Sequence, residues 1–370
     1  MVKSCKLKIE DAMLSNKESK DIKKLYNAIN NGQDKVCSSL IKKIPILNID
    51  NSRNETGFAV LHLATVLGHV KIVKDLIQKG ANLNVITSAG FTALHLTTSS
   101  NKFDIAKLLI ENGANINVLV NTMTALELSF CYSASKISEL LLANNADTTI
   151  QHYKGDLLHL AAEIGDTETI KLLLKYNADI NIVNNNRTAL ELAILNGQLK
   201  TVELLLENNT DTTITYSNGF TALHTATAKG YTEIIKLLMD KVDINLQDDQ
   251  GWAILHLTVI NNQPDMVRLL LEKKALTALS DKDGRTPLHL AAKYNNLEIA
   301  KLLIENEANI NAIDNGNYTP LHLATDHGYI TMTKLLIDNG ADVTIQFHEE
   351  GITPLHLAVD SNNLTTVSIL

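Results

Sequence analysis

GRTPLHLAAKYNNLEIAKLLIENEANINAIDNG, residues 284–316, is the clearest copy of a pattern that fills most of the chain. Thr286 is a common residue directly before a helix. Pro287 suits the first helical position, because the N–H that proline lacks would have no partner there. Leu288 and Ala291 follow at helical spacing and give a narrow apolar face. The first half of this stretch therefore predicts a short helix.

The second half predicts another helix and a turn. Residues 297–305 have the spacing of an amphipathic helix, with Ile299, Leu302 and Leu303 on its inward face. An extended segment then leads to a turn at 314–316. Each copy is thus expected to be a helix, a turn, a second helix and a loop.

The pattern recurs along the chain at a nearly constant period. A leucine stands at the same place in ten copies, 32 to 34 residues apart: Leu61, Leu94, Leu126, Leu158, Leu190, Leu223, Leu255, Leu288, Leu321 and Leu355. A single unit of this length cannot bury its own apolar face, so neighbouring units must cover it. The sequence predicts a linear array with one continuous core.

The motifs within the copies identify a family. Thr-Pro-Leu-His stands at 286–289, 319–322 and 353–356, and Gly-Ala-Asn and Gly-Ala-Asp stand at 113–115 and 340–342. These motifs resemble the ankyrin repeat. The resemblance implies an all-α solenoid of stacked helix-turn-helix units, joined by β-turn or hairpin loops.

The copies divide the chain into three parts. We expect a partly disordered tail over residues 1–20, a degenerate capping repeat over 21–53, and ten ankyrin repeats over 54–370, the last truncated. Copies three to five depart most from the family pattern, and Thr122 replaces the turn glycine of copy three. Because glycine adopts positive φ at little cost, we expect the weakest interfaces near residues 120–215.

Composition narrows the class of protein. Hydrophobic residues make up 45% and charged residues 20%, and the net charge is −8. These values are typical of a soluble globular chain, and the charge disfavours a nucleic-acid or anionic-membrane surface. No apolar run is long enough to span a membrane, and Met1 to Leu14 is too polar for a signal peptide. Three widely spaced cysteines favour a reducing, cytoplasmic compartment. We expect a monomer without cofactors.

Eight of the twelve histidines share one position, directly after the repeated leucine: His62, His95, His159, His224, His256, His289, His322 and His356. Spaced one per copy, they cannot converge on a ligand. The resemblance implies that each hydrogen-bonds backbone and ties adjacent units together. Glu127 and Glu191 replace the histidine in copies three and five. No catalytic or metal-binding motif is present, so no enzyme activity is predicted.

Candidate binding residues stand where the repeat does not dictate the side chain. The resemblance implies that partners dock on turn tips and first helices, which line a concave face. Three positions before the repeated leucine stand the residues we call slot residues: Phe58, Phe91, Met123, Gly155, Arg187, Phe220, Trp252, Arg285, Tyr318 and Ile352. All except Gly155 are candidates, together with Tyr132 and Tyr294 in the turn between the helices. Aromatic residues and arginine are common interface hot spots. The alternative is that the rings pack on the neighbouring turn.

Two functional hypotheses follow. The first is a scaffold that binds another protein on the concave face. The second is the targeting module of a larger secreted effector or toxin from an intracellular bacterium or virus, acting in the host cytoplasm, with an enzymatic domain beyond Leu370. Asn181 and Asn245 also resemble ankyrin asparagines that a hydroxylase modifies. The favoured interpretation is that they hydrogen-bond the turn.

Overall fold

The computed structural model describes residues 16–150, 155–347 and 351–370. These residues form 23 α-helices, one 3₁₀ helix and a few isolated β-bridges. The chain divides into two compact units, residues 1–158 with 168–178 and residues 159–167 with 179–370. The all-α class predicted from the sequence is confirmed.

The first unit and copy four contain eleven helices among the described residues. Their bounds are α1 (Asn16–Asn30), α2 (Asp34–Lys43), α3 (Ile46–Asn51), α4 (Val60–Leu67), α5 (Val70–Gln78), α6 (Ala93–Ser99), α7 (Phe103–Glu111), α8 (Ala125–Cys131), α9 (Ser135–Ala143), α10 (Leu157–Ile164) and α11 (Thr167–Lys175). From copy one onwards each copy contributes two consecutive helices. The division between the units falls inside copy four.

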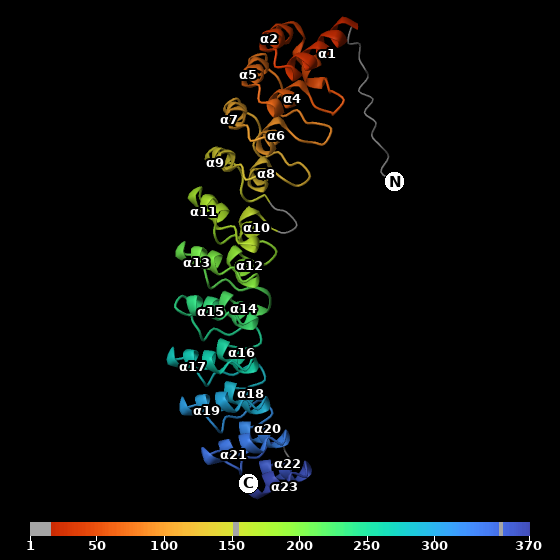
Figure 1. Ribbon diagram of the computed structural model, residues 1–370. Helices are drawn as coiled ribbons and strands as arrows, with labels where there is room; N and C mark the ends of the chain where they lie inside the picture. The colour runs from red at the N-terminus through yellow and green to blue at the C-terminus, as the bar shows by residue number, and fades with distance from the viewer. Residues whose placement is uncertain (1–15, 151–154, 348–350) are drawn as a thin grey trace, which may run out of the picture. The chain divides into compact units, whose positions relative to one another are not determined.

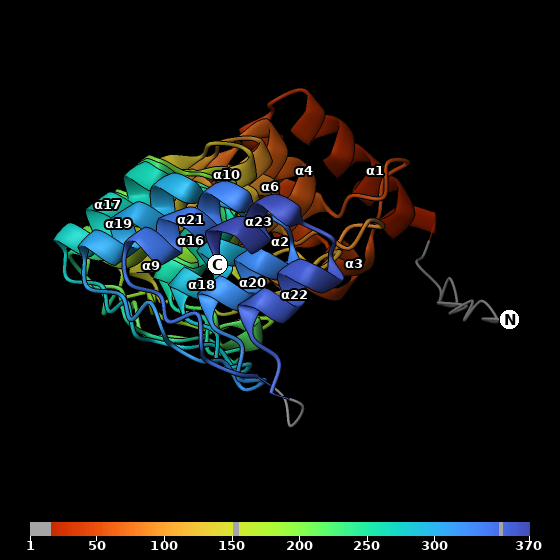
Figure 2. The same ribbon diagram turned by 90° about the horizontal axis from the view of Figure 1, so that it is seen from below.

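The second unit continues with the same alternation. Its further bounds are α12 (Ala189–Leu195), α13 (Leu199–Glu207), η1 (Ser217–Gly219), α14 (Ala222–Lys229), α15 (Thr232–Met239), α16 (Ile254–Ile260), α17 (Pro264–Glu272), α18 (Pro287–Lys293), α19 (Leu297–Glu305), α20 (Pro320–Asp326), α21 (Ile330–Asp338), α22 (Pro354–Asp360) and α23 (Leu364–Ile369). Even-numbered helices from α12 to α22 pack in one row and odd-numbered helices in a second (Figure 1). The loops that enter α18 and α20 lie together on one side of these rows (Figure 2).

Copy eight has the predicted form. Thr286 caps α18, which begins at Pro287. The second helix, α19, begins and ends at the predicted residues 297 and 305, and Leu303 on its inward face is fully buried. The narrow face of α18 allows close approach of neighbouring first helices, and bulky side chains on α19 fill the space behind them.

The N-terminal segment packs as a helix pair. Helix α1 lies against α2 and α4, and α2 lies against α5. Leu25 is fully buried, and the hydroxyl of Tyr26 donates to the carbonyl of Phe58 at 2.9 Å. Because α1 begins at Asn16, residues 16–20 of the expected tail are helical. Residues 1–15 of that tail lie outside the described residues.

Copy three shows the effect of its missing glycine. Thr122 has a φ of +73°, a left-handed conformation that a β-branched residue adopts at a cost of roughly 1–2 kcal/mol. The corresponding residue of copy two is Gly90, with φ +88°. Both Thr122 and the division in copy four fall within residues 120–215, where the sequence predicts the weakest interfaces.

Candidate partner-binding surface

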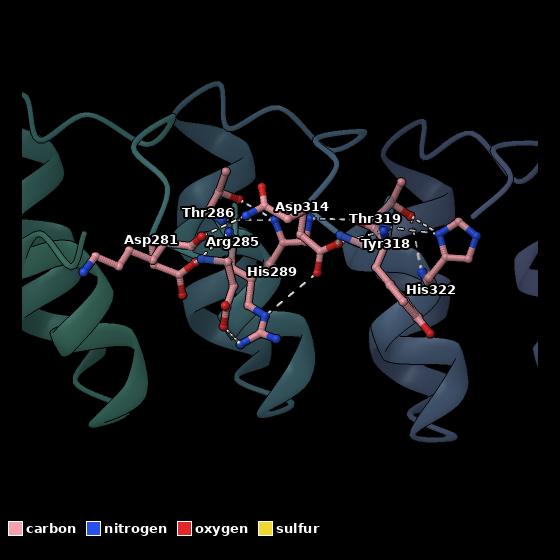
Figure 3. A network of polar contacts seen from close by, with 12 residues as sticks. Asp281, Arg285, Thr286, His289, Asp314, Tyr318, Thr319 and His322 are labelled. Carbon is pink, nitrogen blue, oxygen red and sulfur yellow. Dashed lines mark hydrogen bonds and ion pairs between the residues drawn. The ribbon is translucent and has the colours of Figure 1, made fainter. Parts of the chain in front are cut away.

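Histidines of the row bond the loops that follow their helices. Nδ1 of His289 accepts the N–H of Thr286 at 3.1 Å, while its Nε2–H donates to the carbonyl of Tyr318 at 3.0 Å (Figure 3). The Nε2–H groups of six copies donate in this way: His62 to Val85, His95 to Val118, His159 to Arg187, His224 to Trp252, His256 to Arg285 and His289 to Tyr318. Four of these bonds reach the slot carbonyl of the next copy, so the predicted tie between copies is confirmed for His159, His224, His256 and His289.

These histidines are neutral for a physical reason. Burial lowers the pKa of His289, and it lowers the pKa of His62 to about 4. A protonated ring would also lose the lone pair with which Nδ1 accepts the N–H at the start of the helix. Burial and hydrogen bonding therefore select the same neutral form.

The loop before each first helix holds its slot residue by the backbone. Oδ1 of Asp314 accepts the N–H of Tyr318 at 2.9 Å, and the N–H of Asp314 donates to the carbonyl of Tyr318 at 2.9 Å (Figure 3). Asp281 makes the same pair of bonds to Arg285. The carbonyls of Arg285 and Tyr318 thus each accept one bond from their own loop and one from the preceding histidine.

Successive loops also bond to each other. The N–H of Asn315 donates to the carbonyl of Asp283 at 2.8 Å. This approach requires Gly284, whose φ is +80°, because a Cβ there would lie 2.7 Å from the backbone nitrogen of Asn315. The loops of copies eight and nine are therefore held at a fixed spacing.

Four of the five aromatic slot residues lie half-buried against the histidine of their own copy. Ring centroids are 6.1 Å apart for Phe58 and His62, 6.2 Å for Phe91 and His95, 5.5 Å for Phe220 and His224, and 6.1 Å for Tyr318 and His322. These contacts are made within a copy, whereas the sequence alternative places the rings on the neighbouring turn. Among the other slot residues, Met123, Trp252, Arg285 and Ile352 are half-buried and Arg187 is exposed.

Tyr318 also makes the contact with the neighbouring turn that the sequence alternative describes. Its ring stacks on Phe347 of the next loop, with centroids 4.0 Å apart, and Phe347 is buried. Since Phe347 also contacts His322, these three rings form one cluster. Tyr318 therefore packs two copies together.

Three of the predicted residues meet at one hollow between copies seven and eight. Trp252, Arg285 and Tyr294 line it together with Gln250, Ile260, Asp281, Lys282, Asp283, Leu290 and Lys293, and its volume is about 140 Å³. The loops supply one wall and helices α16 and α18 the other. Tyr294 is 48% exposed, so part of this apolar surface is open to solvent. Tyr132, the corresponding turn residue of copy three, is 57% exposed in the first unit.

The two glutamates of the histidine row differ. Oε2 of Glu127 accepts the N–H and the hydroxyl of Thr124. Glu191 is equally buried, but its Oε2 has no hydrogen-bond partner among the described residues. Burial raises the pKa of Glu191 to about 7, and the charge of Arg187 opposes this shift. The hydroxyl of Thr188 instead bonds the hydroxyl of the buried Tyr216 at 2.9 Å.

Asparagines after the second helices bond the following copy. Oδ1 of Asn181 accepts the N–H of Asp211 at 2.8 Å, and Oδ1 of Asn245 accepts the N–H of Leu276 at 2.9 Å. The favoured interpretation from sequence has these side chains bonding their turn, and the structure extends that role to the next copy's backbone. Their modification stays a hypothesis.

The described residues contain no group of three or more metal-ligating side chains and no helix long and apolar enough to cross a membrane. A model of the family described as ankyrin repeats matches residues 2–87, 82–152, 151–216, 208–281, 274–347 and 317–370. Among solved structures, the chain is similar to the crystal structure of the ankyrin repeat domain of Bcl-3, a unique member of the IkappaB protein family. The two are 27% identical with a TM-score of 0.53, over 57% of this chain and 96% of that one. A search of curated proteins found no match.

Proposed function

Because this chain belongs to the ankyrin-repeat family, whose members mediate protein–protein interaction, we propose that it is a scaffold that binds a partner protein at the hollow between copies seven and eight. The family fold is typically a non-enzymatic binding scaffold. The observation that carries the proposal is the meeting of Trp252, Arg285 and Tyr294 at one partly open hollow. Hot-spot residues bind best when they cluster around a pocket that the partner can fill.

The residues to mutate in a binding test are those whose side chains have no other packing role. Tyr318 supports Phe347 and His322, so its removal would disturb packing as well as binding. No ring pair among the described residues involves Trp252. The ring of Tyr294 lies in the turn after α18, and the ammonium group of Lys293 lies 5.7 Å from its centroid. Trp252 and Tyr294 are therefore the better probes of binding.

The test is affinity capture from cell lysate with the full chain and a W252A/Y294A variant. The matched control is L276A/I313A, which removes two apolar side chains of similar exposure, 52% and 54%, outside the hollow. We expect a partner that the chain and the control both capture and the W252A/Y294A variant loses. Equal capture by all three proteins, at matched thermal stability, would refute the proposal.

A further inference from the structure

The charged side chains around the hollow between copies seven and eight differ in whether they already have a partner. Its lining includes three cationic side chains, Lys282, Arg285 and Lys293, and two carboxylates, Asp281 and Asp283. The chain as a whole has a net charge of −8. The lining therefore carries three positive and two negative charges, on a protein that is acidic overall.

Both carboxylates already have partners. Asp281 is buried, and its Oδ1 accepts the N–H groups of Asp283 and Arg285 at 2.9 and 2.8 Å. The side chain of Asp283 pairs with the guanidinium of Arg285 at 2.8 Å. Arg285 also lies 3.9 Å from the buried carboxylate of Asp314. Each of these four side chains therefore already has a partner within the loops, and together they carry one positive and three negative charges.

The two lysines have no carboxylate partner among the described residues. Lys282 is exposed, and hydrogen bonds fix its backbone on both sides: its N–H donates to the carbonyl of Gln250, and its carbonyl accepts the side-chain amide of Asn315, both at 2.8 Å. The ammonium group of Lys293 lies 5.7 Å from the centroid of the Tyr294 ring. Two unpaired positive charges are thus held at the edge of the hollow.

The apolar part of the lining defines the size of what enters. Trp252 and Ile260 are half-buried, Leu290 is buried and Tyr294 is exposed. A cavity of about 150 Å³ accepts a benzene-sized group. The volume of about 140 Å³ is therefore suited to one large apolar side chain.

We propose that this hollow accepts an extended segment of the partner protein in which one aromatic or large aliphatic side chain is flanked by acidic residues. The inference rests on the proposed function and adds the chemistry of the partner. The apolar side chain lies against Trp252 and Tyr294, and the flanking carboxylates lie near Lys282 and Lys293. Single-stranded RNA combines rings with negative charge too, but affinity for it depends on neutralising many phosphates, and this chain is acidic overall.

The experiment selects peptides of about twelve residues from a random displayed library on the immobilised full chain, with counter-selection on the W252A/Y294A variant. We expect peptides that carry two or more acidic residues next to an aromatic residue or leucine. Binding of the best peptide is expected to weaken about tenfold or more in a K282E/K293E variant, and to weaken as ionic strength rises.

The control is K200E/K301E, which makes the same change of charge on the exposed faces of α13 and α19 and is expected to retain peptide binding. Selected peptides without acidic residues, equal binding by K282E/K293E, absence of peptides that need the hollow, or displacement of the peptide by single-stranded RNA would each overturn the inference. A partner retained by K282E/K293E but lost by W252A/Y294A would overturn the acidic chemistry alone and leave the proposed function intact.

Discussion

Replacing Glu191 by glutamine tests whether the fifth copy contains a buried acid that destabilises the protein at neutral and alkaline pH. Glu191 is 7% exposed, and its Oε2 has no hydrogen-bond partner among the described residues. Burial of such a group favours its protonated form. Glutamine has nearly the same shape and carries no charge at any pH.

The magnitude follows from the pKa. Burial raises the pKa of Glu191 from 4.5 to about 7, which corresponds to about 3 kcal/mol of unfolding free energy. The folded state holds the proton more tightly than the unfolded state. The stabilisation is therefore fully present below pH 4.5 and is lost as pH rises to about 7. The Glu191→Gln variant is expected to lack this loss and to gain up to about 3 kcal/mol over the unmodified chain above pH 7.

The assay is urea unfolding followed by circular dichroism across this pH range, with amide hydrogen exchange of α12 and α14 as a local measure, because long repeat arrays unfold in parts. Glu127→Gln is the matched control. Its carboxylate accepts two hydrogen bonds from Thr124, so the change is not expected to stabilise the protein. If Glu191→Gln has the same pH dependence as the unmodified chain, the reasoning about burial is wrong.

Three further predictions concern the repeat itself. Burial lowers the pKa of His62 to about 4, so the contribution of the neutral ring to folding stability is present above pH 6.5 and is lost toward pH 4. Amide hydrogen exchange in copy one should therefore speed up over that range, and His62→Asn should reduce this acceleration. Thr122→Gly should stabilise the protein by about 1 kcal/mol, seen as a higher melting temperature, whereas Thr122→Ala, which keeps the Cβ, should not. Asn245→Ala should cost about 0.5–1.5 kcal/mol in urea unfolding because the exposed N–H of Leu276 exchanges its side-chain acceptor for water, and Asn245→Asp, which keeps an oxygen there, should cost less.

Local features of the fold were predictable from the sequence. The bounds of the second helix in copy eight follow from residues 297–305, and the cap at Thr286 follows from the proline beside it. These features depend on residues within one copy, where spacing and backbone preference are sufficient. The histidine bonds required the family resemblance, because they cross from one copy to the next.

Contacts that need the geometry between copies were not predictable. In the N-terminal helix pair, Tyr26 stands at the position that histidine has in the repeats, and its hydroxyl donates to the carbonyl of Phe58. The only indication of this bond in the sequence is the place of Tyr26 directly after Leu25. Packing of the slot rings on the neighbouring turn was the sequence alternative, but the sequence did not indicate that Tyr318 would stack on Phe347. The hollow that joins Trp252 to Tyr294 depends on how one copy is displaced from the next, which no single repeat encodes.

Because its carbonyl accepts two backbone-fixing hydrogen bonds, a slot residue is placed by its backbone, and its side chain is free to vary. At Trp252, Arg285 and Tyr318 the backbone makes the same bonds to the aspartate four residues earlier and to the preceding histidine, although the side chains differ completely. The frame therefore does not depend on which side chain it carries. Under the proposed function, a substitution at Trp252 or Arg285 would change the surface offered to a partner and leave these backbone bonds in place, so a new specificity would need only a single mutational step.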